Sequence, residues 1–394
     1  MGKHCLDFLC LLVIFCFPLL HSYLALAAGT DDGSEQWGYV EVRPAHLFWW
    51  HYKSPHRVQD PAKPWPDEAA VVGSDEEAAA DLAALLEELF NGNQALQKST
   101  LYIFAESYGG KFAATLGVSA LKAIEAGELK LQLGGVALGD SWISPEDFVF
   151  TWGPLLKDLS RMNSNGLNSA NSLAVKIQKQ LAEGKYEDAT SSWSELEHVV
   201  LSNSNNVDFY NFLLDYVNDP IVGSTAQGSR GVTKMNPSPG SIGVRPSPVD
   251  LHELINGPIR RKLKIIPENV TWDGQGGLVF QALIGDFMKP RIQELLAKGI
   301  NVTIYNGQLD LICSTKGAEA WVNKLKWDGL QNFLSLDRSP LSCRSDNTTT
   351  KGFTSSYKNL FFYWILGAGH FVPAEQPCIS LQMVGNVTKS PNNF

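Results

Sequence analysis

Three short segments of this chain carry side chains that together could perform acyl-transfer chemistry. Ser107 lies in the segment 105–109 that directly follows the apolar run at 101–104, Asp310 follows the apolar strand pattern at 302–305, and His370 follows a similar pattern at 361–366. A serine hydroxyl is a weak nucleophile until a base removes its proton, and a carboxylate holds that base in the correct tautomer. These three residue types therefore predict a nucleophile, a general base and an orienting acid.

The pattern around Ser107 also predicts how the nucleophile is presented. An expected strand runs into a sharp turn at Ser107 and then into an expected helix, which is the pattern of a nucleophile elbow. Ala105 and Gly109 are small enough for such a tight turn. The chain order serine, aspartate, histidine is typical of α/β-hydrolases and differs from the orders of chymotrypsin and subtilisin. We therefore expect an α/β fold of the α/β-hydrolase type.

The elements that must position these side chains can be read from periodicity. Aromatic and β-branched residues alternate over 37–52 and predict a pair of strands, and Ser74 with Glu77 forms a capping box for a helix that leads into the serine strand. The other expected elements are helices at 111–126, 251–264, 278–298, 318–325 and 378–384 and a parallel strand at 131–138.

Residues 145–248 interrupt this α/β pattern. Their first part is mainly helical, and residues 222–248 are rich in Gly, Ser and Pro with interspersed basic residues. We expect a helical cap insertion that ends in an exposed, flexible loop. One α/β domain over 28–394, with this insertion, is the predicted organisation.

Composition excludes several classes of protein. The chain has 394 residues, of which 44% are hydrophobic, and a formal net charge of -9. That content is enough for a large core, and it is unlike a disordered or fibrous protein. A nucleic-acid-binding surface needs clustered Lys and Arg that this balance does not supply. The expected partners are therefore peptides or small molecules.

The N-terminal sequence is typical of a secretory signal. Lys3 precedes a largely apolar stretch that ends in small residues, so we expect residues 1–27 to be removed after Ala27, with no membrane segment afterwards. A membrane anchor is the competing interpretation, but the break near Pro18 and the small residues favour removal. Secretion would suit glycosylation at four Asn-x-Ser/Thr sequons, although such sequons also occur by chance. They lie at Asn269, Asn301, Asn347 and Asn386, and Asn301 opens a predicted core strand.

Five motifs together resemble the serine carboxypeptidase family. They are GYVEV at 38–42, AESYGGK at 105–111, GDSWISP at 139–145, YNGQLD at 305–310 and GHFVP at 369–373. The similarity runs from about Trp37 to the C-terminus and is nearest the retinoid-inducible branch of the plant serine carboxypeptidase-like group. It implies hydrolysis of C-terminal peptide bonds in an acidic secretory, vacuolar, lysosomal or extracellular setting without a cofactor. Some plant relatives transfer acyl groups instead.

The resemblance also implies a role for each site residue. Ser107 would be the nucleophile, Asp310 the orienting carboxylate and His370 the base and later the acid. The backbone N–H of Tyr108 would donate to the oxyanion. Glu106 would hold the C-terminal carboxylate of the substrate through a shared proton, which needs a raised pKa. A salt-bridged Glu106 beside the turn is the alternative.

One part of the family pattern is missing from this sequence. The family has two further strands and a Gly-Gly-Pro-Gly loop before the helix that begins near Ser74, whereas here Pro66 runs directly into Asp67. Two such units would correspond to roughly 60 residues at about 30 residues each. The loop would supply a second oxyanion donor and partners of Glu106, so we expect impaired or absent activity. An alternative splice product, an incomplete gene model and a non-catalytic secreted glycoprotein are the other interpretations.

Cysteines and possible metal ligands complete the sequence-based expectations. After signal removal three cysteines remain, and we expect Cys313 to pair with Cys343 across the loop after the aspartate strand, which leaves Cys378 odd. A pair of inert thiols is the alternative. No metal site is expected, because His252-Glu253 lacks the second histidine of a zinc motif.

Overall fold

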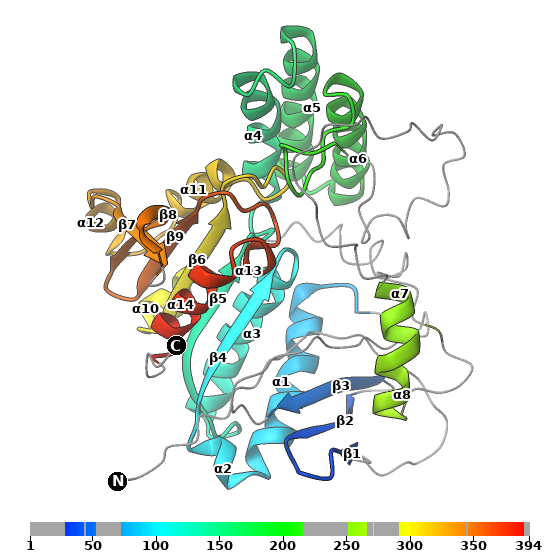
Figure 1. The fold of residues 1–394 in the computed structure, drawn as a ribbon, viewed down its shortest axis with the longest axis vertical. Helices are drawn as coiled ribbons and strands as arrows, with labels where there is room; N and C mark the ends of the chain where they lie inside the picture. Colours follow the sequence, from blue (N-terminus) through cyan, green and yellow to red (C-terminus); the bar gives the residue numbers. More distant parts are fainter. Residues whose placement is uncertain are drawn as a thin grey trace.

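A computed structural model describes residues 28–42, 45–52, 72–215, 251–265, 271, 291–343 and 346–389. These residues form a six-stranded sheet with helices on its faces, a layer of helices beyond one end of that sheet, and a separate three-stranded sheet (Figure 1). The expected leader at 1–27, the junction between Pro66 and Asp67, the loop at 222–248 and the sequon at Asn269 lie outside the described residues.

The six-stranded sheet is mainly parallel. Its strands, in spatial order, are β4 (Thr100–Glu106), β5 (Gln132–Gly139), β6 (Asn301–Gly307), β9 (Leu360–Ile365), β8 (Asp346–Tyr357) and β7 (Ser339–Cys343). The first four are parallel, and β8 and β7 continue the sheet in antiparallel pairs. Because parallel strands end at a common edge, the residues that follow β4, β5, β6 and β9 come together there. The predicted α/β class is confirmed.

Both faces of the sheet are buried, which explains why its central strands are nearly continuous apolar runs. Ile304 pairs with Phe362, and both belong to the large core that the helices of one face complete. Tyr305 pairs with Tyr363 and faces a smaller core on the opposite side. The first face carries α3 (Gly109–Ala126) and α10 (Ile292–Ala297), and the second carries α14 (Pro377–Thr388). Helix α1 (Asp75–Asn91) packs on the outside of α3. Short helices α2 (Gln94–Gln97), α11 (Thr315–Val322), α12 (Leu330–Leu334) and α13 (Val372–Glu375) lie in the connections.

The predicted capping box of α1 forms with one variation. The Ser74 hydroxyl accepts the N–H of Glu77 at 3.2 Å. The Glu77 carboxylate reaches back to the N–H of Gly73 at 2.8 Å, one residue before the position that the motif predicts. Two N-terminal backbone donors are still satisfied, so the helix begins where the sequence indicates.

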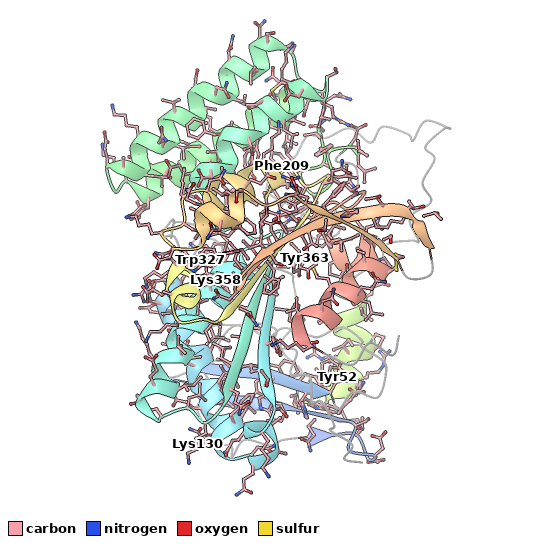
Figure 2. All side chains as sticks on the ribbon, turned by 90° about the vertical axis from the view of Figure 1, so that its left-hand side faces the viewer. Tyr52, Lys130, Phe209, Trp327, Lys358 and Tyr363 are labelled. Carbon is pink, nitrogen blue, oxygen red and sulfur yellow. A yellow bond between two sulfur atoms is a disulfide. The ribbon has the colours of Figure 1, made fainter. Side chains whose placement is uncertain are left out.

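The predicted helices of the insertion lie beyond the C-terminal ends of the parallel strands. They are α4 (Pro145–Asp158), α5 (Ser164–Ala182) and α6 (Tyr186–Asn203). Trp152 contacts Phe209 edge-on, with ring centroids 4.9 Å apart, and its indole N–H donates to the carbonyl of Ile312 at 3.2 Å. Figure 2 labels Phe209 at the junction between these helices and the sheet. The helical layer therefore rests directly on the loops that follow β6.

The predicted N-terminal strands form a sheet of their own. It consists of β1 (Ala28–Gly29), β2 (Glu35–Val42) and β3 (Ala45–Tyr52), and it packs on α7 (Leu251–Leu254), the π-helical turn η3 (Ile255–Ile259) and α8 (Arg260–Leu263). The indole N–H of Trp37 donates to the carbonyl of Leu263 at 2.9 Å. Among the described strands nothing pairs with the outer side of β4, so the serine strand ends the six-stranded sheet there.

The sequence pattern does not predict β7 and β8. Their residues are mostly polar, including a run of threonines, and an exposed hairpin of this kind lacks the apolar alternation that marks a strand. Among the described residues, no helix combines the length and apolarity that crossing a bilayer requires.

Candidate active site

Ser107 occupies the strained turn that a nucleophile elbow requires. It follows β4 directly and has φ of 57°, a left-handed conformation that is uncommon for residues other than glycine. Its backbone is held on both sides, because its N–H donates to Gly139 at 3.0 Å and its carbonyl accepts from Trp142 at 2.9 Å. These bonds come from β5 and the loop after it, so the neighbouring parallel strand fixes the turn.

The small residues around the elbow differ in how tightly they are enclosed. A Cβ on Gly109 would lie 3.5 Å from the Cβ of Ala105, which is ordinary contact. A Cβ on Gly110 would lie 2.2 Å from the hydroxyl oxygen of Ser141, which is too close for any side chain. The first turn of α3 therefore approaches the β5 loop at Gly110, one residue beyond the glycine that the sequence singled out.

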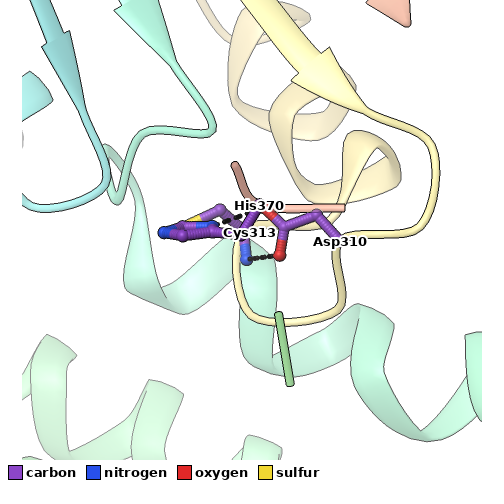
Figure 3. Close-up of side chains that lie close together, drawn as sticks. All are labelled: Asp310, Cys313 and His370. Carbon is purple, nitrogen blue, oxygen red and sulfur yellow. Dashed lines mark hydrogen bonds and ion pairs between the residues drawn. The ribbon is translucent and has the colours of Figure 1, made fainter. Parts of the chain in front are cut away.

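Asp310 and His370 form the acid–base half of the predicted triad. His370 Nδ1 lies 2.8 Å from Asp310 Oδ2, and both side chains are almost fully buried (Figure 3). The other carboxylate oxygen of Asp310 accepts the N–H of Cys313 at 3.1 Å. Because Nδ1 faces the carboxylate, Nε2 is the ring nitrogen that acts as the base in an arrangement of this kind.

The structure places Ser107 at the same edge of the sheet but not in hydrogen-bond contact with the base. The three residues follow β4, β6 and β9, whose parallel C-terminal ends share one edge. Within the described part of the chain, the Ser107 hydroxyl makes no hydrogen bond. Catalytic hydrogen bonds are often long in ligand-free structures and shorten when substrate binds, so this geometry is compatible with a triad.

Glu106 has the electrostatic surroundings that a proton-sharing carboxyl needs. Partial burial raises its pKa to about 7; the charge of His370 opposes this shift, and Asp310 and Glu375 add to it. Such a carboxyl keeps its proton in an acidic compartment and can donate a hydrogen bond there. The expected alternative, a salt-bridged glutamate, would require a lowered pKa instead.

Tyr108 is fixed by a buried ion pair that the sequence does not reveal. It precedes α3, its ring packs on Phe112, and its hydroxyl donates to Asp75 at 3.2 Å. The same Asp75 pairs with the fully buried ammonium of Lys111 at 2.8 Å. The first turn of α3, and with it the backbone N–H of Tyr108, is therefore tied to the start of α1.

Comparison with known proteins shows which family the chain belongs to. The serine carboxypeptidase family profile matches residues 66–390. Serine carboxypeptidase-like 51 of Arabidopsis thaliana is 50% identical over 431 residues, covering 92% of this chain and 93% of the relative. The chain belongs to the serine carboxypeptidase family. The retinoid-inducible serine carboxypeptidase of Homo sapiens is 38% identical over 439 residues, covering 94% and 96%. The predicted resemblance is confirmed.

A solved carboxypeptidase has the same fold. The structure of Kex1, a prohormone-processing carboxypeptidase from Saccharomyces cerevisiae, matches 83% of this chain and 70% of its own with a TM-score of 0.65. At 18% sequence identity this likeness supports the fold alone. The chain is thus a serine hydrolase of the carboxypeptidase family with an α/β-hydrolase fold.

The predicted disulfide is wrong. Cys343 pairs with Cys378 rather than with Cys313, and the Cα atoms of the pair are 6.0 Å apart. Cys343 ends β7, which packs against α14, and Cys378 lies in the first turn of that helix. Cys313 is buried beside Asp310 and unpaired, and burial raises the pKa of its thiol. Proximity along the chain suggested a pairing that the packing of β7 on α14 does not allow.

Three side chains of the site could superficially suggest a metal centre. Among the described residues, potential ligand atoms of Asp310, Cys313 and His370 all lie within 4.8 Å of one another (Figure 3). His370 Nδ1 already bonds to Asp310, and the raised pKa of Cys313 opposes formation of the thiolate that metals bind. We therefore interpret the group as the acid–base pair of the hydrolase with a neighbouring thiol.

The sequons that the structure describes differ in accessibility. Asn386 is exposed on α14, whereas Asn301 is half-buried at the start of β6. The hydroxyl residues of both sequons, Thr388 and Thr303, are buried. The side chain of Asn347 lies outside the described residues. Glycosylation therefore stays a prediction at these positions, and Asn386 is the more exposed of the two asparagines.

Proposed function

We propose that this chain releases C-terminal residues from peptides through an acyl-enzyme on Ser107. The observation that carries the proposal is the buried 2.8 Å bond between Asp310 and His370 at the same sheet edge as a strained serine elbow. Family membership supports the same reaction. The relatives are named serine carboxypeptidases, and nothing in the comparisons favours a non-catalytic interpretation.

The proposed roles of these residues give each proton transfer a direction. His370 Nε2 would take the Ser107 proton as the hydroxyl oxygen attacks the scissile carbonyl carbon, and Asp310 would stabilise the resulting imidazolium through Nδ1. The Tyr108 N–H would donate to the oxyanion. His370 would then pass its proton to the departing amino group, and water activated by the same imidazole would hydrolyse the ester.

Glu106 gives the proposal its specificity for chain ends. A protonated carboxyl can donate a hydrogen bond to the free carboxylate of the substrate, and Glu106 directly precedes the nucleophile. Its pKa of about 7 keeps that proton in place under acidic conditions. We therefore propose peptides with a free C-terminal carboxylate as the substrates.

We further propose that the missing segment before Asp67 lowers the rate without abolishing it. An alignment of 431 residues exceeds the 394 residues of this chain, so the Arabidopsis relative contains positions that this chain lacks. Loss of one oxyanion donor typically costs about 2.7–4 kcal/mol of transition-state stabilisation. A comparison of activity with and without the corresponding segment of the relative, inserted between Pro66 and Asp67, measures this cost.

The proposed setting is the secretory pathway, with delivery to the extracellular space, a vacuole or a lysosome. The signal-like pattern at 1–27 and the Cys343–Cys378 disulfide support an oxidising route. Recovery of the mature protein from medium or acidic organelles, with its N-terminus after Ala27, is the expected result of expression in a eukaryotic secretory host.

Fluorophosphonate labelling tests the proposed reaction directly. We expect the wild-type protein to become labelled at Ser107, as mapped by mass spectrometry, and to release the C-terminal residue of a blocked peptide. Ser107→Ala and His370→Ala should remove both signals, while circular dichroism confirms that the variants are folded. Peptide release that persists in folded Ser107→Ala would overturn the assignment.

A further inference from the structure

Asp140 is a buried carboxyl of the active site to which sequence reasoning gave no role. It follows β5 directly, with φ of 39° and no solvent exposure. Its N–H donates to the carbonyl of Tyr305 at 2.8 Å, and its Oδ1 accepts the N–H of Gly307 at 2.7 Å. Asp140 is therefore fixed at the strand end between the serine strand and the aspartate strand.

The second oxygen of Asp140 presents an electrostatic problem. Among the described residues, Oδ2 has no hydrogen-bond donor although it is buried. The carboxylate of Asp310 is an electrostatic neighbour of Asp140 and raises its pKa, and two ionised carboxylates offer only acceptors to each other. A buried charge without a donor is costly, and two adjacent like charges are costlier. One proton on Asp140 Oδ2 removes both costs, because that oxygen then becomes a donor.

We propose that Asp140 is a positioning residue that carries a proton and donates it in a hydrogen bond to Asp310. This inference rests on the proposed function, because it deepens the role of the same acid–base pair. Asp310 would then accept three hydrogen bonds, from His370, from the N–H of Cys313 and from Asp140. The three donors fix the plane of the carboxylate against the imidazole ring.

The surrounding groups favour this proton position. Burial is the largest cause that raises the pKa of Asp140 well above its usual range, and the charge of Asp310 is the next. Glu106, at the end of β4, raises it further, whereas the Gly307 N–H on Oδ1 lowers it. The thiol of Cys313, after β6, is held neutral by its own burial and contributes no competing charge. His370, after β9, acts on Asp140 through Asp310, to which it is bonded.

The hydrogen bond would also set the acidity range in which the base works. An unshielded Asp310 carboxylate would stabilise the imidazolium form of His370, and only the neutral imidazole can take the Ser107 proton. A proton donated by Asp140 draws part of that negative charge away from His370. The base therefore stays competent at lower pH, as a hydrolase of acidic compartments requires.

Infrared difference spectroscopy tests the proton directly and does not depend on activity. The wild-type minus Asp140→Asn spectrum at about pH 6, well above the usual pKa of an aspartate, should contain the C=O stretch of a protonated carboxyl that shifts in D2O. A wild-type spectrum in which Asp140→Asn removes only ionised carboxylate bands would overturn the proposal. This result stands even if the wild-type protein fails to react with fluorophosphonate, which would refute the proposed function alone.

The pH profile of fluorophosphonate labelling tests the tuning. The probe has no carboxylate for Glu106 to bind, so the role of Glu106 in substrate binding does not affect the labelling rate. Asp140→Ala removes the donor and should move the acid limb of the labelling rate up by about one pH unit. Asp140→Asn keeps a donor at the Oδ2 position and an acceptor for Gly307, and its acid limb should move by less than half as much.

Glu197→Gln is the matched control for the pH profile. Burial raises the pKa of Glu197, on α6, to about 8, so it too is a protonated carboxyl, but it lies outside the acid–base cluster. Its replacement should remove a protonated-carboxyl band without moving the acid limb. Equal acid limbs in folded Asp140→Ala and Asp140→Asn would refute the tuning role.

Discussion

The acid–base half and the nucleophile half of the proposed active site are anchored in different ways. Asp310 and His370 follow β6 and β9, which have strands on both sides. The segment 207–215 adds backbone bonds to both loops: the carbonyl of Tyr210 accepts from His370 at 2.7 Å, and that of Phe209 accepts from Ile312 at 3.0 Å. Backbone geometry thus fixes this half redundantly.

The nucleophile half depends on fewer contacts. Ser107 follows β4, which has a paired strand on only one side among the described residues. On its other flank the elbow is held by side chains, chiefly the buried Lys111–Asp75 ion pair that joins α3 to α1. Substitutions in the acid–base half should therefore impair catalysis with little loss of folding stability. Substitutions in the nucleophile half should lower folding stability first.

Asp310→Asn should give the largest effect and confine it to chemistry. The amide keeps its bond to Cys313 but stabilises the wrong tautomer of His370, so we expect kcat to fall by about ten-thousand-fold. The urea midpoint should change little. Asp158→Asn, on the exposed part of α4, is the control and should leave kcat unchanged. A fall of less than tenfold in Asp310→Asn would show that the acid is not Asp310.

Lys111→Met should show the opposite behaviour. It leaves Asp75 buried without its cation, so the free energy of unfolding should fall by about 3–5 kcal/mol in urea titrations. The exposed pair Lys176–Glu195 supplies the control, and Lys176→Met should cost less than about 1 kcal/mol. Combining Lys111→Met with Asp75→Leu should recover most of the loss. An unchanged midpoint in Lys111→Met would mean that the elbow is held by other contacts.

The smallest expected effect is a pH dependence at Glu106. Its raised pKa of about 7 means that the proton is present below that pH, so kcat/KM for peptides with a free carboxylate should fall as pH rises through about 7. The contribution of this proton to folding stability is complete below the unfolded pKa of about 4.3 and is lost as pH rises from there through the folded-state pKa of about 7. Glu106→Gln should remove this limb, and peptides amidated at the C-terminus should not show it in the wild type. A limb shared by both peptide types would assign it to another group.

Local chemistry made some of these features predictable from sequence. The elbow around Ser107, the strands before Asp310 and His370, and the cap of α1 at Ser74 are each specified by neighbouring residues, so the pattern is visible in the chain itself. The disulfide partner of Cys343 is specified by packing between β7 and α14, which no local pattern encodes.

Burial was the property that sequence could not supply. Asp140 and Lys111 both stand in recognised motifs, but their importance comes from complete exclusion of solvent and from partners far away in the chain. A charged residue in a motif looks the same whether it lies at the surface or in the core. The polar strands β7 and β8 were not predicted for a related reason. The pairing of β8 with β9 and of β7 with β8, and not their composition, makes them strands.

The backbone bonds of the segment 207–215 bear on how this enzyme could be diversified. The carbonyls of Phe209 and Tyr210 accept hydrogen bonds from the loops that carry the proposed acid and base. The helical insertion therefore cannot be exchanged as a whole without affecting those loops. Helices α5 and α6 could be shortened, extended or exchanged for those of a relative to admit other peptides. A chimera that also replaced 207–215 would remove the backbone hydrogen bonds that position the loops of Asp310 and His370. The exchanged segment should therefore end before these nine residues.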